Sequence, residues 1–260
     1  MTSAGTTRFR RFKGVLAAPY DNDPSGAFPI YATSKPFDLS EYAQESANPS
    51  VETFDNVVKA LPDELFMDLG CGRRERKFDN CLYVEVYPSV SADLIVEANC
   101  RYPIRDGTLR GIGCFAVLEH TRQPWVVVQE MRRMLKPGGQ VFIDWPFLQP
   151  VHGYPSHFFN ATREGLTSVF EDEGFTVDQA FTGIHQTAAY TLQWMIGRFA
   201  YHLQNTGDLE LLHEFAQMTF GEAAAMSQQD PRWWKFLNAL PPDAFAELAA
   251  GNMLFATKTG

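Results

Sequence analysis

The chain has 260 residues, 45% of them hydrophobic and 20% charged, with a formal net charge of −9. These values suit one α/β domain with a sizeable insertion. They exclude the global basic field that holds nucleic acid or an anionic membrane. The polar, basic amino terminus lacks the apolar core of a signal peptide, and no run approaches the roughly eighteen apolar residues of a membrane span.

Cysteine and histidine spacing bears on metals and on the cellular compartment. The four cysteines form no Cys-x-x-Cys pair, which argues against a zinc site and against a disulfide framework. His185, His202 and His213 do not form a ligand cluster by spacing. We therefore expect no metal and a cytoplasmic location.

The first 60 residues divide into an arm and a helix. Residues 1–50 are rich in Pro, Ser, Asp and aromatic residues, so we expect an irregular amino-terminal arm that packs through its aromatics. Residues 51–61 carry apolar side chains at helical spacing. Pro62 is expected to end that helix.

From residue 65 onward, short apolar runs alternate with helical patterns. Helices are predicted over 125–135 and 162–173, the second capped by Asn160 or Thr162. Alternating strands and helices imply βαβ units, a mostly parallel sheet and helices on both of its faces. The predicted strands cover residues 65–69, 82–86, 92–96, 113–118, 140–145 and 175–181.

The last third of the chain reads as a helical insertion followed by one more strand. Helices are predicted over 188–203, 209–226 and 242–250, and a strand over 252–258 that would pair back beside strand six. The insertion would cover the carboxyl ends of the strands, where ligands bind in open α/β sheets. The expected organisation is an arm (1–50), a Rossmann-like core (51–184), a helical insertion or cap (185–250) and a final core strand (251–260).

The most informative motif is the Gly-x-Gly turn after the first core strand. Glycine at Gly70 and Gly72 lets the backbone pass close beneath a ligand, because no Cβ intrudes. Glu85 ends the next strand and is placed to accept hydrogen bonds from ribose hydroxyls, as acidic residues do in Rossmann sites. The interval of about 15 residues is shorter than the usual ~20. We therefore expect a short helix, or a loop in its place, between the two strands.

Several motifs, in order, resemble those of class I methyltransferases of the type 11 group. The resemblance covers roughly residues 60–180. It implies a Rossmann-like, seven-stranded, mostly parallel sheet with an antiparallel last strand, S-adenosylmethionine as cofactor and S-adenosylhomocysteine as product. The motifs are Asp68-Leu-Gly-Cys-Gly72, Val117-Leu-Glu-His120, Glu130-Met-Arg-Arg-Met-Leu-Lys-Pro-Gly-Gly139, Pro146-Phe147, His152-Gly-Tyr-Pro155, Thr162-Arg-Glu-Gly-Leu166 and Glu173-Gly-Phe175.

Carried over residue by residue, the resemblance implies a cofactor site. Glu85 would hold the ribose diol, and Val86 would touch the adenine. Glu97 stands where the family usually has Asp, near the adenine amino group. Phe115 and Ala116 would line the sulfonium end. The implied cofactor residues are Asp68, Gly70, Cys71, Gly72, Glu85, Val86, Glu97, Ala98, Asn99, Phe115 and Ala116.

The turn also departs from the family pattern. The usual third glycine is absent, and Arg73-Arg-Glu-Arg-Lys77 follows Gly72. This basic stretch is compatible with a solvated loop. The alternative is that Arg73 or Arg74 pairs with the cofactor carboxylate or with an anionic substrate.

The resemblance also bears on the chemistry of transfer. Methyl transfer from a sulfonium is an in-line displacement that depends on positioning, and oxygen or nitrogen nucleophiles often need a general base such as histidine. His120 and His152 follow strands four and five and are the candidate catalytic residues, with a purely structural role as the alternative for each. Trp145, Tyr154 and His157 are candidate substrate-binding residues.

We therefore expect a methyltransferase that acts on an oxygen or nitrogen atom of a small organic acceptor. The aromatic group Trp194, Trp233, Trp234 and Phe236 is compatible with an acceptor pocket, with the core of the insertion or with a homodimer contact. One alternative is a non-catalytic S-adenosylmethionine-binding or scaffold protein. Another is a nicotinamide-dependent oxidoreductase, which is disfavoured because the third glycine of the dinucleotide fingerprint is missing.

Overall fold

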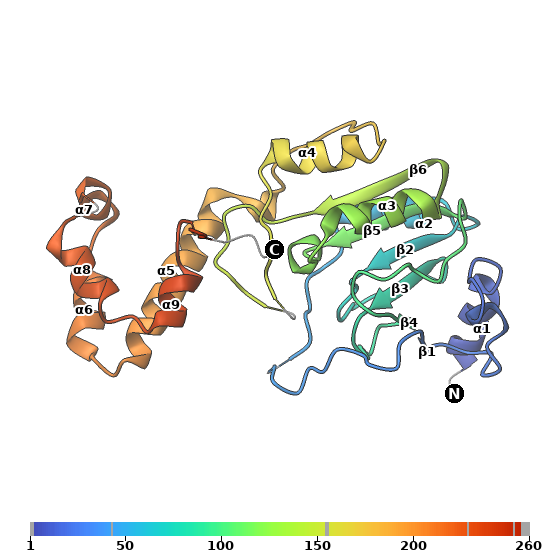
Figure 1. Ribbon diagram of the computed structural model, residues 1–260, viewed down its shortest axis with the longest axis horizontal. Helices are drawn as coiled ribbons and strands as arrows, with labels where there is room; N and C mark the ends of the chain where they lie inside the picture. The colour runs from blue at the N-terminus through green and yellow to red at the C-terminus, as the bar shows by residue number, and fades with distance from the viewer. Residues whose placement is uncertain (1–2, 43, 154–155, 228, 252, 256–260) are drawn as a thin grey trace, which may run out of the picture. The chain divides into compact units, whose positions relative to one another are not determined.

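The computed structural model describes residues 3–42, 44–153, 156–227, 229–251 and 253–255. The chain forms two compact units, which are described separately (Figure 1). The core unit comprises residues 1–147 and 154–181, and the helical unit comprises residues 148–153 and 182–260.

The core unit is built on a six-stranded sheet in which every neighbouring pair of described strands is parallel. The four residues of β2 and the five of β3 are all buried, which is why these strands read as continuous apolar runs. The sheet confirms the α/β class. The strands are β1 (Ile30–Tyr31), β2 (Phe66–Leu69), β3 (Cys81–Glu85), β4 (Leu94–Ile95), β5 (Leu109–Phe115) and β6 (Leu135–Asp144), in the order β1-β4-β3-β2-β5-β6.

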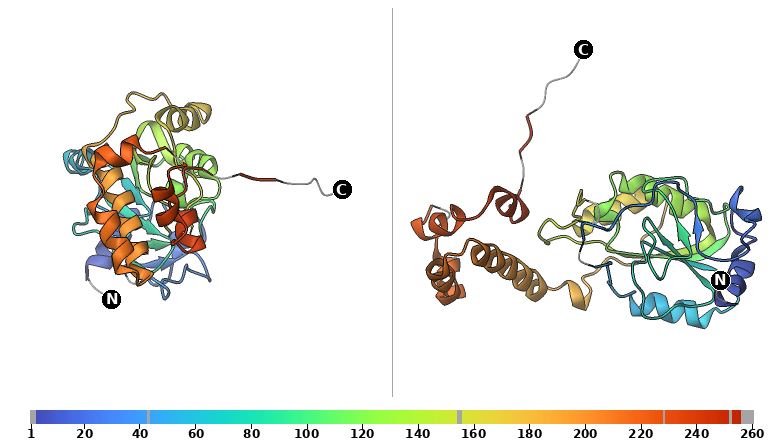
Figure 2. Two further views of the ribbon diagram at one scale, coloured as in Figure 1. Left: turned by 90° about the vertical axis from the view of Figure 1, so that its left-hand side faces the viewer. Right: turned by 90° about the horizontal axis from the view of Figure 1, so that it is seen from below.

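Helices cover both faces of this sheet, as predicted. Helices α2 (Glu52–Ala60) and α3 (Pro124–Met134) lie on opposite faces (Figure 2). Helix α4 (Arg163–Asp172) packs beside α3, and the Thr162 side chain accepts the first-turn N–H of Gly165. The three helices confirm the predictions over 51–61, 125–135 and 162–173.

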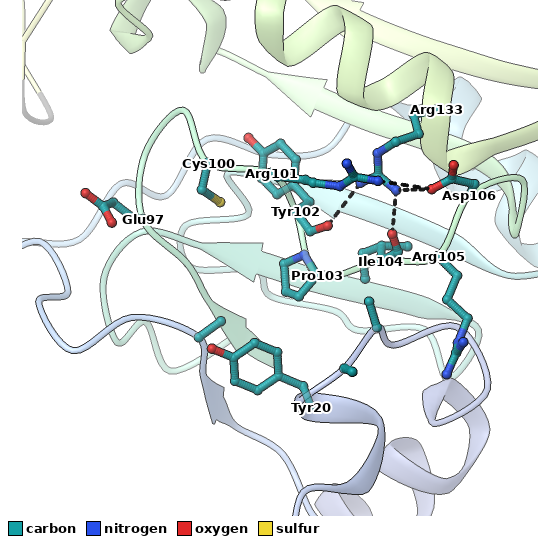
Figure 3. A pocket seen from close by; sticks show the side chains of 13 residues that line it. Tyr20, Glu97, Cys100, Arg101, Tyr102, Pro103, Ile104, Arg105, Asp106 and Arg133 are labelled. Atoms are coloured by element: carbon teal, nitrogen blue, oxygen red, sulfur yellow. Dashed lines mark hydrogen bonds and ion pairs between the residues drawn. The ribbon is translucent and has the colours of Figure 1, made fainter.

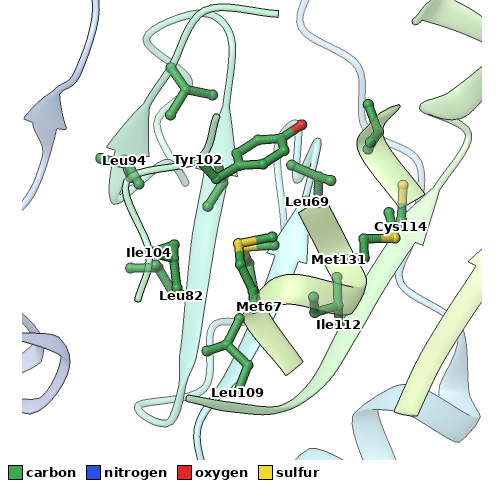
Figure 4. Close-up of a cluster of buried hydrophobic side chains, with 14 of the residues drawn as sticks. Met67, Leu69, Leu82, Leu94, Tyr102, Ile104, Leu109, Ile112, Cys114 and Met131 are labelled. Atoms are coloured by element: carbon green, nitrogen blue, oxygen red, sulfur yellow. The ribbon is translucent and has the colours of Figure 1, made fainter. Parts of the chain in front are cut away.

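The larger hydrophobic cluster lies on the α3 face of the sheet and joins Met67, Leu69 and Ile112 to Met131 of α3 (Figure 4). Phe66 belongs instead to the cluster on the α2 face. Successive side chains of a strand point to opposite faces. Asp68 therefore shares the α2 face with Phe66, a placement that matters for the site.

The expectation of an irregular arm over residues 1–50 is partly wrong, because the segment contains helix α1 (Ser3–Phe12) and strand β1. Arg8 of α1 is buried at the amino ends of β3 and β4. Its Nη2 lies 2.5 Å from Asp93 Oδ2 and 2.5 Å from the Cys81 carbonyl oxygen. Lys77 Nζ lies 2.8 Å from Asp93 Oδ1. A buried charge is tolerated when it is paired and hydrogen-bonded in this way.

The predicted sixth strand is also wrong. Residues 175–181 form no strand. Phe175 instead packs on Phe170 of α4, with ring centroids 5.4 Å apart. Residues 251 and 253–255 form no strand either, and the remaining residues of the predicted last strand lie outside the described residues.

The helical unit packs its helices around an apolar core. The predicted helix over 209–226 is two helices, because Thr219 begins a new one with a capping box to Glu222. Phe199 stacks on Phe215 with ring centroids 4.9 Å apart. Among the described residues, no helix is both long and apolar enough to cross a membrane. The helices are α5 (Ala188–Asn205), α6 (Leu209–Gln217), α7 (Phe220–Ala225), α8 (Pro231–Leu237) and α9 (Pro242–Glu247).

Candidate functional site

The strand order changes direction at β2, with β3 and β4 on one side of it and β5 and β6 on the other. Ligands of open α/β sheets bind outside the carboxyl ends of the strands at such a point. Gly70 follows β2 here with φ of +68°, and a Cβ added to it would lie 2.3 Å from Cγ2 of Val117, which follows β5. The close approach of the turn after β5 to the turn after β2 therefore requires glycine at position 70.

Most of the predicted cofactor residues meet at this edge. Glu85 and Phe115 end β3 and β5. Asn99, after β4, and Ala116, after β5, are the two described non-glycine residues with positive φ, at 57° and 55°. Backbone conformations of this kind cluster at functional sites. The Asn99 side-chain oxygen is buried, and no residue in the described part of the chain donates a hydrogen bond to it.

The carboxylate of Glu85 joins β3 to the glycine turn. Its Oε1 accepts the N–H of Gly72 at 3.0 Å, and its Oε2 accepts the N–H of Val86 at 2.5 Å. Burial raises the pKa of Glu85 to about 7, against the lowering effect of both backbone donors. The strand-end carboxylate and the glycine turn thus lie side by side.

Part of the amino-terminal arm lies on the same turn, which sequence reasoning missed. The Ser46 carbonyl oxygen accepts the N–H of Arg73 at 2.7 Å. A Cβ added to Gly72 would lie 2.4 Å from that oxygen. Ser89 Oγ donates to the Gly72 carbonyl at 2.7 Å and lies 3.4 Å from Glu45 Oε2. Gly72 is therefore required by the close approach of the arm.

The basic stretch after the turn is not uniformly solvated. Arg73 is exposed, whereas the Arg74 side chain is 4% exposed and pairs with Asp68, whose side chain is 1% exposed. Arg74 Nε lies 2.7 Å from Asp68 Oδ2, and Nη2 lies 2.9 Å from Oδ1. Burial raises the pKa of Asp68 although Arg74 acts to lower it. In the sequence, Arg74 is one of several charged residues in a row, and nothing in that row indicated this ion pair.

On the β5 side, two of the predicted residues come together. His120 Nδ1 lies 2.9 Å from the Ser156 carbonyl oxygen. A carbonyl only accepts, so in the neutral ring Nδ1 carries the proton and Nε2 keeps the lone pair. The rings of His120 and His157 lie 5.7 Å apart. Burial lowers the pKa of His157, whose Nε2 lies 2.6 Å from Asn160 Oδ1.

Glu119, beside His120, is a buried carboxyl that sequence reasoning did not select. Burial, with the charge of Asp144 as a further cause, raises its pKa to about 8. Its backbone carbonyl accepts the N–H of Phe158 at 2.6 Å. The available signal was its position directly after the apolar residues Val117 and Leu118, in the turn that follows β5.

The other candidate substrate residues are distributed differently. Trp145 is buried and donates its indole N–H to the Phe159 carbonyl at 3.1 Å, so it braces the loop after β6. His152 lies in the helical unit, with Nδ1 2.9 Å from the Pro150 carbonyl and its ring 5.0 Å from that of Trp194. Tyr154 lies outside the described residues.

A hollow of about 530 Å³ opens beside the carboxyl end of β4. Figure 3 shows Glu97 at one end of it and Asp106 with Arg133 at the other. Arg133 Nη1 lies 2.6 Å from Asp106 Oδ1 and 2.6 Å from the Ile104 carbonyl, and Nη2 lies 3.0 Å from the Tyr102 carbonyl. The charges at that end are thus engaged within the protein.

Comparisons with known proteins point to one family. Residues 67–143, from β2 to β6, match the family described as "Methyltransferase domain". No curated protein matches the chain.

Solved structures give distant likenesses. One chain of the complex that contains the Haloferax volcanii Trm112 methyltransferase activator is 16% identical, with a TM-score of 0.35 over 45% of this chain and 62% of that one. The Haemonchus contortus phospholethanolamine N-methyltransferase 2, in complex with phosphomonomethylethanolamine and S-adenosylhomocysteine, is 15% identical, with a TM-score of 0.35 over 62% and 42%. The [4+2]-cyclase SpnF is 16% identical, with a TM-score of 0.38 over 90% and 89%. The chain thus spans less than two thirds of the first two, and TM-scores this low carry no argument.

The family match and the geometry meet on the same segment. The matched residues include the glycine turn, Glu85, the Asn99 and Ala116 turns and the whole of β5. Residues 67–143, from β2 to β6, are thus similar to the methyltransferase domain family.

Proposed function

We propose that this chain transfers the methyl group of S-adenosylmethionine to an oxygen or nitrogen atom of a small organic acceptor in the cytoplasm. One observation carries the proposal: the buried carboxylate of Glu85 is held against the glycine turn by the N–H of Gly72. A strand-end carboxylate beside a Gly-x-Gly turn suits recognition of a ribose diol. The acidic net charge of −9 favours an organic acceptor over nucleic acid.

The residues at this edge suit the cofactor. Glu85 would accept from the ribose hydroxyls, with Gly70, Cys71 and Gly72 bordering the ribose and methionine parts. Val86, Glu97, Ala98 and Asn99 would surround the adenine. The buried Asn99 oxygen, with no donor among the described residues, fits an exocyclic amino group. When bound, the cofactor supplies a methyl group activated on a sulfonium.

The residues at the β5 end supply the acceptor side. Phe115 and Ala116 would line the sulfonium end. His120 is the proposed general base, because its Nδ1–H donates to the Ser156 carbonyl and this tautomer keeps the ring lone pair on Nε2, which lies 3.7 Å from Glu119 Oε1. His152 is the second candidate base. Trp145, Tyr154 and His157 are proposed to shape the acceptor pocket, Trp145 by holding the loop after β6.

Calorimetric titration with S-adenosylmethionine, S-adenosylhomocysteine and NADH tests the cofactor. We expect micromolar binding of the first two, lost in Glu85→Ala and retained in Glu75→Ala, which alters an exposed carboxylate of the same loop. Binding of NADH alone, or of nothing, would contradict the proposal. Binding of the sulfonium cofactor without transfer to any of a panel of hydroxyl, amine and carboxylate acceptors would indicate a non-catalytic or scaffold protein.

A further inference from the structure

The connection from β2 to β3 lacks the helix that usually follows a glycine turn. In Rossmann-like sites that helix directs its amino terminus, which carries a partial positive charge, toward an anionic group of the ligand. Residues 70–80, all of which the structure describes, contain no helix. The positive end that the fold usually supplies at this place is therefore missing.

A buried cation lies at the same place. Arg74, two residues beyond Gly72, folds back beneath the turn onto Asp68 at the end of β2. Its Cζ lies 6.0 Å from the ring centre of Phe115 at the end of β5. Its Nη1 also donates to the carbonyl of Asn48 in the arm. The guanidinium thus contacts Asp68 of β2 and Asn48 of the arm, and it lies near Phe115 at the end of β5. These segments surround the point at which the strand order changes direction.

The Arg74 guanidinium has N–H donors left over that could bind a ligand. A guanidinium carries five N–H donors in a fixed fork, and three of them are used by Asp68 and Asn48. Neighbouring Arg73 and Arg76 are exposed, and Lys77 is paired with Asp93, so Arg74 is the cation of this stretch that lies buried beside the glycine turn. The Asp68–Arg74 pair also offers both signs of charge, as does the amino acid end of S-adenosylmethionine.

We infer that Arg74 binds the carboxylate of the amino acid end of the cofactor, in place of the missing helix terminus. The inference rests on the proposed function. Asp68 holds the guanidinium in a bidentate geometry that orients its remaining donors, and the contact with Asn48 couples the arm to the same side chain. Arg74 is therefore a cofactor-binding residue that the family's glycine pattern does not indicate.

The test compares S-adenosylmethionine with decarboxylated S-adenosylmethionine, which lacks only the carboxylate. A charge-assisted hydrogen bond contributes about 1.5–3 kcal/mol, so the wild-type protein should bind the complete cofactor roughly 10- to 100-fold more tightly. In Arg74→Ala this ratio should fall toward one. Arg74→Lys, which keeps the charge but not the fork, should give an intermediate ratio. Arg73→Ala is the matched control and should keep the wild-type ratio.

Each outcome discriminates. An equal loss of affinity for both ligands in Arg74→Ala would overturn the inference, because Arg74 would then only shape the loop. Unchanged affinity for both ligands in Arg74→Ala would overturn it as well. If Arg74→Ala does not fold, the Arg74→Lys ratio decides, since a lysine can still pair with Asp68. Binding of neither ligand by the wild-type protein would overturn the proposed function itself, and the inference with it.

Discussion

The two units bury different kinds of side chain. Among its described residues, the core unit buries four carboxyl groups, Asp68, Glu85, Asp93 and Glu119. In the described part of the helical unit, every buried side chain is apolar, and the paired Glu247 remains 15% exposed. Burying a charge is costly unless partners compensate for it. Buried carboxyl groups therefore mark positions in the core unit where the choice of side chain is determined by something other than packing.

Within the core unit, the two edges of the sheet differ in turn. At the amino edge, Asp93 is paired with Arg8 and Lys77. At the carboxyl edge, burial raises the pKa of Glu85 to about 7 and of Glu119 to about 8. Acids with perturbed pKa values cluster at functional sites, whereas the charge of Asp93 is balanced by two cations of the same unit. We call the amino edge the structural edge and the carboxyl edge, where the cofactor is proposed to bind, the reactive edge.

The largest expected effect comes from breaking the structural edge. Asp93→Ala leaves Arg8 buried without its main partner, and removing one member of a buried pair costs about 3–5 kcal/mol. Chemical denaturation should show that loss in the free energy of unfolding of the core unit. Asp79→Ala is the control, since Asp79 is exposed and lies 3.9 Å from Arg8. A loss below 1 kcal/mol in Asp93→Ala would contradict a structural role for this edge.

A somewhat smaller effect is expected in the helical unit. Phe236, which is 1% exposed, packs against Phe215 and Trp233, so Phe236→Ala should cost about 3 kcal/mol. Because the residues proposed to bind the cofactor lie in the core unit, the dissociation constant for S-adenosylmethionine should not change. Trp234→Ala, at a 46% exposed position, is the control for stability. A tenfold loss of cofactor affinity in Phe236→Ala would break the division between the units.

Glu119 should make the reactive edge sensitive to pH. Its pKa is about 8 in the folded protein and near 4.5 in the unfolded chain, so between these values the folded state retains a proton that the unfolded state releases. Stability therefore falls as pH rises through this window. Glu119→Gln, which cannot ionise, should match the wild-type protein near pH 4.5 and exceed it by about 1–3 kcal/mol at pH 9. A parallel pH profile for the two proteins would contradict the raised pKa.

The parts of the fold that could be predicted are those with a local signal. The apolar run before Gly70 and the helical spacing of residues 51–61 predicted β2 and α2, because burial on a regular element imposes a period. The strand over 175–181 failed because the pairing of an apolar segment depends on a distant partner, and Phe175 instead packs on α4. Helix α1 was missed because its short basic sequence is stabilised by Arg8 binding across the sheet edge.

The site divides in the same way. Motif spacing predicted that Glu85 and the glycine turn would be brought together, and the structure has them in contact. No spacing could indicate that Arg74 would fold back onto Asp68 or that Ser46 would lie against Gly72, because both contacts depend on the path of a loop and an arm. The raised pKa of Glu119 likewise follows from burial, which a single sequence does not state.

The smallest expected effects compare one helix cap in each unit. The hydroxyl of Thr162 accepts the Gly165 N–H at 3.0 Å at the start of α4, and that of Thr219 accepts the Glu222 N–H at 3.2 Å at the start of α7. Replacing either by Ala removes a first-turn acceptor and should cost about 1 kcal/mol. The two substitutions lie in different compact units, so Thr162→Ala should lower the unfolding transition of the core unit and Thr219→Ala that of the helical unit. Hydrogen exchange, read helix by helix, measures both, with Thr162→Ser and Thr219→Ser as controls that keep the hydroxyl. If either cap variant raised exchange equally in both units, the units would unfold as one cooperative body, and the contrast between their cores would reflect composition alone.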